Sequence, residues 1–393
     1  MTDEGKTDRP MRIVFLSTSE GWGGLEMNLL RHARWMAERG HIVRILCIAD
    51  SPLHRAGLAH ILQLEGTDQA FDCRTIRRGW RYLAFATAIH RATRLIRHKA
   101  DWLWIRDPRD LDTSAMARRI IGLLGGKTRL VFHQGMQIPK PKRSPYHRFR
   151  FSAIDKWVTP LEWLKSQVCG NTPMSATRVH VVPLGLDDRW FAPVTDRIQQ
   201  QRMARLGLGL SQESFVVTLV GRIDRKKGQD VLVEALKDLP PDVHALIVGD
   251  PTLDTLSDYF DEVRSFVRDN ELQWRVHFRP YAEFPRDAFI AADVVAVCST
   301  QESVGSVTLE AMATGCAIIG TDRGGTSELL GNGRGWTFPA GDPDALADAL
   351  LTLRNHPDAL PQRIEAGIPY IEQHRRDRLI ARWEQVLSER AEA

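Results

Sequence analysis

Two stretches of this chain each alternate a short apolar run, a glycine-containing loop and a helix, and this alternation constrains the fold more than any other feature. Residues 11–17 (MRIVFLS) predict a buried strand. The loop EGWGGLE follows, and a helix-periodic segment then ends at Gly40, before a second apolar run at 41–49. The same order begins again at 214–223. Strands that alternate with helices form parallel sheets with crossover helices, so the sequence predicts two doubly wound α/β halves.

The length of 393 residues is that of a two-domain protein. We expect the first domain to span residues 1–190 and the second to span residues 191–371. The segment 188–213 is polar and charged, which predicts a linker. The last helical segment, residues 372–393, is expected to pack back on the first domain.

Composition narrows the class of protein. The chain has no apolar run of the roughly 18 residues that a membrane-spanning helix needs. The opening MTDEGKTDRP is polar and lacks the apolar core of an export signal. The five cysteines are scattered and never form a CxxC pair, which predicts reduced thiols rather than disulfides or a zinc site. We therefore expect a cytoplasmic protein.

The net charge of +4 conceals an asymmetry between the two halves. Residues 1–190 hold 31 basic and 18 acidic residues, whereas the remainder holds 22 basic and 31 acidic ones. A basic half favours an anionic partner such as phosphate groups, a membrane surface or nucleic acid. A solvated basic surface without a partner explains the same numbers.

The segment TQESVGSVTLEAMATG combines two carboxylates with the glycine-containing start of a predicted helix. Glu302 lies just past a predicted strand, and Glu310 lies in the first turns of the helix. Gly305 lets the backbone approach a ligand, and the free N–H groups of Ser306 and Val307 at a helix start attract phosphate. The flanking carboxylates suit the hydroxyl groups of a ribose or hexose. The alternative is that Glu302 caps the helix and Glu310 is a solvated surface acid.

The segment GRIDRKKG also lies between a predicted strand and a predicted helix. It places Arg222 and Lys227 at the same edge of the sheet as Glu302, because the carboxyl ends of parallel strands share one edge. Two cations beside a helix start suit a diphosphate. The alternative is a basic surface turn.

The first half offers weaker signals. Gly23 and Gly24 lie between a strand and a helix but lack GxGxxG spacing, so a nicotinamide cofactor is not supported and a plain tight turn explains them equally well. His133 ends a predicted strand and is expected to face the ligand site, although a lone histidine is more often structural. The DLD at 110–112 has the pattern of a metal-binding acid pair, but a loop or helix cap is the expected role.

Three segments closely resemble the retaining nucleotide-sugar glycosyltransferases of family 4: GRIDRKKG, ESVGSVTLEAMATGCAIIGTDRGGTSELL and GRGWTFPAGDPDALADAL. The opening glycine-rich loop, GWGGLEMNLLRHARWMAERGH, resembles that of the same family. The resemblance covers most of the chain and includes the E-x7-E motif at Glu302 and Glu310, but Val304 replaces a usual aromatic residue. It implies the GT-B fold, in which two Rossmann-like doubly wound parallel-sheet domains face a central cleft.

The resemblance implies a role for each matched residue. Glu302 would hold the donor-sugar hydroxyls and steady the charge at the anomeric carbon, Arg222 and Lys227 would stabilise the leaving diphosphate, and His133 would touch the donor sugar. Donor binding would use Gly23, Gly24, Gly305, Ser306, Val307 and Glu310, the last on the ribose. Fixed cations lower the barrier to departure of a diphosphate directly, so no metal or other cofactor is expected.

The resemblance also implies that the first half binds the acceptor and the second the donor. The expected reaction transfers a hexose from a nucleotide-diphosphate sugar, such as a UDP-sugar, to a glycan or glycolipid acceptor of the lipopolysaccharide type, with retention of configuration. The basic residues of the first half concentrate in segments 74–82, 90–99 and 140–150. Trp80 and Phe85 interleave with the arginines, which suits a surface that docks on anionic lipid at the inner face of a membrane. Ordinary solvated helices fit equally well, and nucleic acid is not an expected partner.

Two other functions remain open on the sequence. One is a sugar-phosphate-acceptor synthase related to sucrose- or trehalose-phosphate synthases, which would be indifferent to lipid. The other is a non-catalytic subunit that binds nucleotide sugars, against which the intact Glu302, Arg222 and Lys227 argue.

Overall fold

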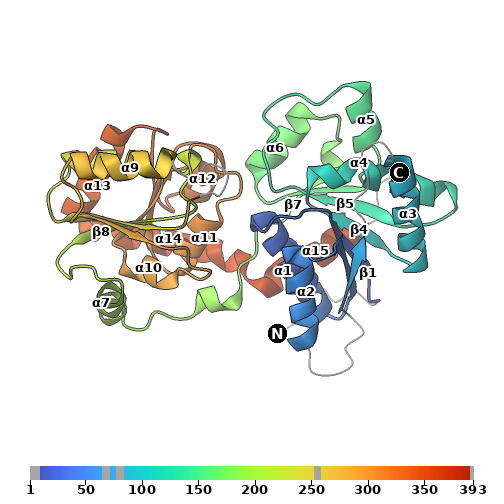
Figure 1. Cartoon of the computed structure of the whole chain (residues 1–393), viewed down its shortest axis with the longest axis horizontal. Coiled ribbons are helices and arrows are strands. Elements are labelled where there is room, and N and C mark those ends of the chain that lie inside the picture. The colour runs from blue at the N-terminus through green and yellow to red at the C-terminus, as the bar shows by residue number, and fades with distance from the viewer. Residues whose placement is uncertain (1–8, 64–70, 77–83, 252–257, 390–393) are drawn as a thin grey trace. The chain divides into compact units, whose positions relative to one another are not determined.

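The computed structural model describes residues 9–63, 71–76, 84–251 and 258–389, and the chain divides into two compact units. The first unit consists of residues 1–183 and 377–393, and the second of residues 184–376. Each unit is a sheet of parallel strands with helices on both faces (Figure 1). The fold is therefore α/β with two Rossmann-like domains, as the alternation of strands and helices predicts.

The first unit has a seven-stranded sheet in the order β3-β2-β1-β4-β5-β6-β7. The strands are β1 (Arg12–Ser17), β2 (Ile42–Ile48), β3 (Phe71–Ile76), β4 (Trp102–Ile105), β5 (Arg129–His133), β6 (Lys156–Thr159) and β7 (Val179–Val181). The strand order reverses between β1 and β4, so the loops that follow these two strands flank the topological switch point, where ligands of such sheets bind.

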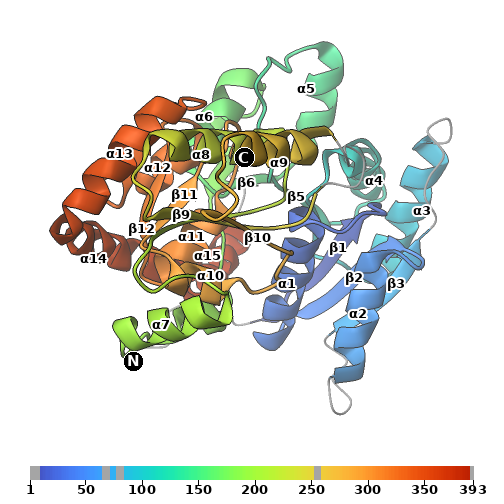
Figure 2. The same ribbon diagram turned by 60° about the vertical axis from the view of Figure 1, so that its left-hand side comes forward.

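Helices cover both faces of this sheet because alternate strand residues point to opposite faces. The helices are α1 (Gly24–Glu38), α2 (Pro52–Gln63), α3 (Ala84–Arg97), α4 (Leu111–Leu123), α5 (Pro145–Phe151), α6 (Glu162–Asn171) and α15 (Arg376–Ser388). One face packs against α1, α2 and α15, and the other packs against α3, α4, α5 and α6. Figure 2 shows α1 and α2 side by side along β1 and β2.

The helix α15 belongs to the first unit although it follows the whole second unit in the chain. Its Leu379, Ile380 and Trp383 are buried in the same core as Phe15. The Trp383 ring lies 4.0 Å from that of Trp104, centroid to centroid. The core of the first unit is thus completed by residues that come more than 190 positions after its last strand.

The second unit has a six-stranded sheet in the order β10-β9-β8-β11-β12-β13. The strands are β8 (Phe215–Val220), β9 (Val243–Val248), β10 (Val276–Arg279), β11 (Val294–Val297), β12 (Ala317–Thr321) and β13 (Trp336–Phe338). Here the order reverses between β8 and β11, which places the loops after these two strands together at the switch point.

The helices of this unit are α7 (Arg197–Gly207), α8 (Gln229–Ala235), α9 (Asp258–Asp269), α10 (Arg286–Ala291), α11 (Ser306–Ala313), α12 (Gly324–Leu330), α13 (Pro343–Asn355) and α14 (Leu360–Ile371). In Figure 1, α9 and α13 lie on one side of the sheet that contains β8, and α10 lies on the other. The main core contains the buried faces of α8, α9 and α13.

The structure differs from the sequence prediction where the two units join. The predicted linker at 188–213 is wrong, because it contains the helix α7, whose Arg205 is buried and ion-paired with Asp293 (2.6 Å). The first unit ends at residue 183 rather than 190. Leu186 explains this boundary, because it is fully buried and its N–H donates to the His374 C=O (2.9 Å) in the second unit.

The described helices were compared with what a membrane-spanning helix requires. None of them combines the length and the apolar character that crossing a bilayer requires. The segment 77–83, which contains Trp80, lies outside the described residues.

Candidate active site

The loops after β8 and β11 are packed directly against each other at the switch point of the second unit. The Thr300 N–H donates to the Lys226 C=O (3.0 Å), which joins the two loops. Gly228 has φ +70°, and a Cβ there would lie 2.4 Å from the Cys298 carbonyl oxygen. Glycine is therefore required for this close approach, which brings the predicted cations and carboxylate together.

Lys227 and Glu302 form an ion pair across this junction. The Lys227 Nζ lies 2.7 Å from the Glu302 Oε2, and the two side chains are 26% and 16% exposed. The Gly305 N–H also donates to Glu302, at 3.3 Å. Burial acts to raise the pKa of Glu302, but the Lys227 charge and these hydrogen bonds outweigh it and hold the pKa below its usual value. The carboxylate is therefore ionised at neutral pH.

The start of α11 adjoins this pair. Gly305 adopts φ +73°, and a Cβ there would lie 2.3 Å from the Leu329 Cδ1, so only glycine fits. The first hydrogen bond of the helix runs from the Leu309 N–H to the Gly305 C=O (3.1 Å). The preceding N–H groups, those of Ser306 and Val307 among them, have no partner within the helix and suit an anion.

Arg222 and Glu310 flank the pair, each on one of these two segments. The Arg222 side chain is exposed, while its backbone is held by the Gln229 side chain, which donates to the Arg222 C=O (2.9 Å). Burial raises the pKa of Tyr281, and the negative charges of Glu283 and then Glu310 add to this effect. The second unit therefore brings all its predicted site residues to one edge of its sheet.

In the first unit, Gly23 and Gly24 form the start of α1 beside the switch point. Gly24 is exposed, and a Cβ added to it would meet no atom of the described residues within 4 Å. Gly23 precedes the helix, and its C=O accepts from the Met27 N–H (3.0 Å). This helix start is open to a ligand, but no contact in the structure tests its predicted role.

His133 ends β5, as the sequence predicts, but its ring is buried at 1% exposure. Its neighbours are the rings of Trp383 (4.8 Å between centroids), His32 (5.0 Å) and Trp104 (5.7 Å). Burial, with Arg106 adding to it, holds the pKa of His133 well below the usual value, so the ring is neutral. A contact with the donor sugar remains a prediction.

Arg106 is a feature that the sequence prediction missed. It follows β4 at the switch point, is 3% exposed, and its Nε and Nη1 are buried without a hydrogen-bond partner among the described residues. Burial lowers its pKa to about 9, with the Arg31 charge adding to the effect and Glu26 opposing it. An arginine after a strand was visible in the sequence, but its burial was not.

Arg106 lines a cavity of about 150 Å³ together with Lys142 and Arg150. The other lining residues are uncharged, and Arg150 is ion-paired with Asp112 (3.0 Å), so Arg106 and Lys142 supply the positive charge of the described wall. A buried guanidinium is costly unless an anion or hydrogen bonds compensate it. The cavity is therefore suited to an anionic group.

The DLD segment has a structural role at its first acid. Asp110 is fully buried, accepts from the Thr18 N–H (3.0 Å) and Oγ1 (2.7 Å), and pairs with Arg91 (3.2 Å). This carboxylate is committed to holding the loop after β1.

The buried rings of His32 and His133 make the first unit sensitive to acid. Burial is the main cause that lowers the pKa of His32 to about 3 and that of His133 well below 6.5. Below pH 6.5 the unfolded chain binds protons that the folded chain does not, so the free energy of unfolding falls as the pH is lowered. We expect a loss of about 1.4 kcal/mol per pH unit for each ring, measured by urea unfolding from pH 7 to pH 4.5. His133→Phe should make this dependence shallower, and an unchanged dependence would contradict the assignment.

Two family models match the chain, one in each unit. Residues 22–190 match the model described as Glycosyltransferase Family 4, and residues 202–368 match the model described as Glycosyl transferases group 1. Each match covers less than half of the chain, and the two Rossmann-like domains are those of the GT-B fold.

Relatives and solved structures agree with the family matches. The chain is 35% identical to a D-inositol 3-phosphate glycosyltransferase of Xylanimonas cellulosilytica, over 48% of this chain and 46% of that protein. It is 31% identical to an alpha-maltose-1-phosphate synthase of Mycolicibacterium smegmatis, over 56% of this chain and 59% of that protein. The chain thus spans about half the length of these relatives. The crystal structure of HepE from Anabaena in complex with UDP superposes with a TM-score of 0.79 at 23% identity, covering 96% of this chain and 100% of that one, which shows a shared fold.

Proposed function

We propose that this chain transfers a sugar from a nucleotide-diphosphate sugar to a phosphorylated acceptor, with retention of configuration at the anomeric carbon. The observation that carries the proposal is the Lys227–Glu302 pair beside the open start of α11, at the switch point of the second unit. The family matches support the reaction class, and the cavity around Arg106 supports the charge of the acceptor.

The donor half of the proposal rests on the negative charge that the leaving diphosphate gains during the reaction. An ammonium group has three N–H donors, so Lys227 can hold Glu302 and a phosphate oxygen at the same time. The departing diphosphate gains negative charge in the transition state, and a fixed cation stabilises it more there than in the ground state. The exposed Arg222 and the N–H groups of Ser306 and Val307 would bind the same diphosphate. The UDP in the HepE complex favours a uridine nucleotide.

Glu302 would act on the sugar. Its lowered pKa keeps it ionised, and an ionised carboxylate accepts hydroxyl donors and stabilises positive charge at the anomeric carbon. Glu310 would accept the hydroxyls of the ribose from the next turn of α11. The proposal requires no metal ion, because Lys227 and Arg222 supply the positive charge beside the leaving group.

The acceptor half rests on the cavity of Arg106. Two of the relatives are named for a phosphorylated substrate or product, inositol 3-phosphate and maltose 1-phosphate. A phosphate in this cavity would compensate the buried guanidinium of Arg106, with Lys142 beside it. These observations favour a small phosphorylated acceptor over the lipopolysaccharide-type acceptor that the sequence led us to expect.

The reaction is tested by incubating the protein with UDP-glucose and either inositol 3-phosphate or unphosphorylated inositol. We expect UDP release that depends on the phosphorylated acceptor and a product whose anomeric proton shows the configuration of the donor by NMR. No UDP release with any sugar nucleotide and acceptor would favour a non-catalytic binding subunit instead.

A glycolipid acceptor remains the alternative. The helix α3 exposes Phe85 (62%), Ile89 (43%) and Ile96 (44%) beside Arg97, which suits a surface on anionic lipid. The test is co-sedimentation with anionic vesicles at two salt concentrations. Binding to the vesicles, together with sugar transfer to a lipid-linked acceptor only, would favour a glycolipid over the small phosphorylated acceptor.

Arg106→Met tests the acceptor half separately. Methionine keeps much of the buried volume but removes the charge, so we expect the KM for inositol 3-phosphate to rise about 10- to 100-fold, as the loss of a charge-assisted hydrogen bond predicts. The KM for UDP-glucose should not change. The matched control is Arg109→Met, because that side chain is 67% exposed and already paired with Asp107. Equal KM values for inositol 3-phosphate in the two variants would contradict the assignment of Arg106 to the acceptor site.

A further inference from the structure

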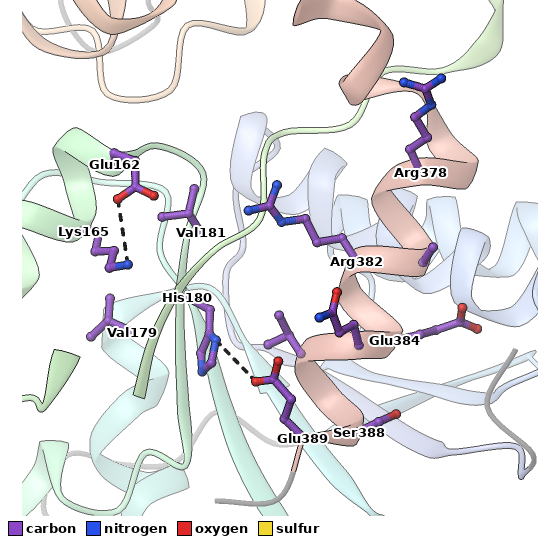
Figure 3. Close-up of a pocket in the computed structure, with 13 residues that line it drawn as sticks. Glu162, Lys165, Val179, His180, Val181, Arg378, Arg382, Glu384, Ser388 and Glu389 are labelled. Carbon is purple, nitrogen blue, oxygen red and sulfur yellow. Dashed lines mark ion pairs between the residues drawn. The ribbon is translucent and has the colours of Figure 1, made fainter. Parts of the chain in front are cut away.

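A cleft of about 880 Å³ lies in the first unit and shares no lining residue with the cavity of Arg106 (Figure 3). The strand β7 lines it between α6 on one side and α15 on the other. β7 is the last strand of its sheet, so the cleft follows an edge of the sheet. It belongs to neither the proposed donor site nor the proposed acceptor site.

The acidic residues of the cleft are already compensated. Each of the three glutamates that line it has a basic partner, and the pairs are Glu384–Arg39 (3.4 Å), Glu389–Lys156 (3.2 Å) and Glu162–Lys165 (3.9 Å). The negative charge of the wall is therefore balanced before any ligand is considered.

Arg378 and Arg382 are different. They lie one turn apart on α15, are exposed and line the cleft, and neither has an ion-pair partner in the part of the chain that the structure describes. Figure 3 shows Arg382 extending from α15 towards β7. Arg378 points in another direction from the same helix, and each guanidinium presents paired N–H donors that match the oxygens of a phosphate.

His180 lies in the same cleft and adds no charge of its own at neutral pH. Burial, with Lys156 beside it, lowers the pKa of His180, and its Nε2 accepts from the Lys156 Nζ (3.1 Å). The uncompensated charge of the cleft is therefore that of the two arginines.

We propose that this cleft binds a small phosphate-bearing anion through Arg378 and Arg382, at a regulatory site separate from both substrates. The volume is that of a small-molecule site. The anion is either a free phosphorylated metabolite or the headgroup of a phospholipid, since both present the same chemistry to the arginines.

The chain connectivity gives such a site an effect on the rest of the protein. The chain passes from the first unit to the second at residues 183/184 and returns at residues 376/377. β7 ends at Val181, just before the first connection, and Arg378 lies just after the second. An anion held between β7 and α15 restrains the ends of both connections, and so it changes the rate of any step in which the units move relative to each other.

The site is tested by equilibrium dialysis of the full chain with labelled inorganic pyrophosphate. The double variant Arg378→Gln/Arg382→Gln should lose one bound pyrophosphate per chain at saturation, or bind it about 10-fold or more weakly. Pyrophosphate that binds at the donor site remains in both proteins. The measurement needs no sugar transfer, so its failure is distinguishable from failure of the proposed reaction.

The matched control is Arg264→Gln/Arg268→Gln, which removes an exposed arginine pair of the same spacing from α9 in the second unit. Identical pyrophosphate binding in the cleft variant and this control would overturn the proposal. If the cleft variant unfolds, Lys165→Gln alone should still weaken binding, because it leaves the negative charge of Glu162 without its partner in the same cleft. Unchanged binding in that variant as well would overturn the proposal.

A second arm identifies the source of the phosphate. Vesicles of phosphatidylcholine with phosphatidylglycerol are compared with vesicles of phosphatidylcholine alone. Loss of vesicle binding in the cleft variant but not in the control assigns a lipid headgroup, whereas loss of pyrophosphate binding only assigns a soluble metabolite. If neither binding depends on Arg378 and Arg382, the proposal is wrong.

Discussion

Replacement of Lys227 by alanine is expected to lower the rate of sugar transfer by about 10²- to 10³-fold without unfolding the protein. The ammonium group lies 2.7 Å from Glu302 and beside the start of α11, where the proposed diphosphate would leave. Its loss removes a stabilising charge that acts mainly in the transition state, so kcat should fall more than affinity for the donor.

The variant also leaves Glu302 without its ion-pair partner. The pKa of that carboxyl should therefore rise. As the pH is lowered, the residual activity should then begin to decline at a higher pH than the activity of the wild type does. Lys226→Ala is the matched control, because Lys226 is an exposed lysine in the same loop. Steady-state kinetics and thermal unfolding of both variants separate catalysis from stability. Near-wild-type turnover of Lys227→Ala would exclude the proposed site.

The largest effect on stability is expected for Gly305→Ala. Alanine at φ +73° costs about 1–2 kcal/mol for the left-handed backbone alone. Its Cβ would also lie 2.3 Å from the Leu329 Cδ1, and overpacking of this kind costs about a further 1–3 kcal/mol. The free energy of unfolding of the second unit should therefore fall by the sum of these two effects.

Gly315→Ala separates the two contributions. Gly315 follows the same helix and has φ +72°, and a Cβ there would meet no atom within 4 Å in the described part of the chain. This variant should lose only the backbone part, so urea unfolding should show a clearly smaller loss than in Gly305→Ala. Equal losses would mean that the contact with Leu329 is relieved without cost.

The alternation of strands and helices was enough to predict both parallel sheets, because buried parallel strands are continuous apolar runs bounded by loops. The placement of Lys227 and Glu302 at one edge of the second sheet was predictable in the same way, since each residue follows a strand and the strand order brings those loops together. Local sequence was therefore enough to predict that these two residues lie at one edge of the sheet, and their roles stay predictions.

What the sequence could not supply was burial by distant residues. His133 was expected at the ligand site, but it lies under rings of His32 and Trp383, which come from helices at opposite ends of the chain. Arg205 belongs to a segment so polar that it predicts a linker, yet an ion pair with Asp293 buries it. A charged residue in a sequence is expected to be exposed to solvent, and only the fold shows the ion-pair partner that allows it to be buried.

The placement of α15 has a consequence for synthesis of the protein on the ribosome. The second unit is continuous in the chain, so its core can close as soon as residue 376 has emerged. The first unit, although made earlier, waits for Trp383 to fill the space beside Trp104. Its apolar face is exposed until then, and chaperones that protect nascent chains have their longest opportunity on the half that is translated first.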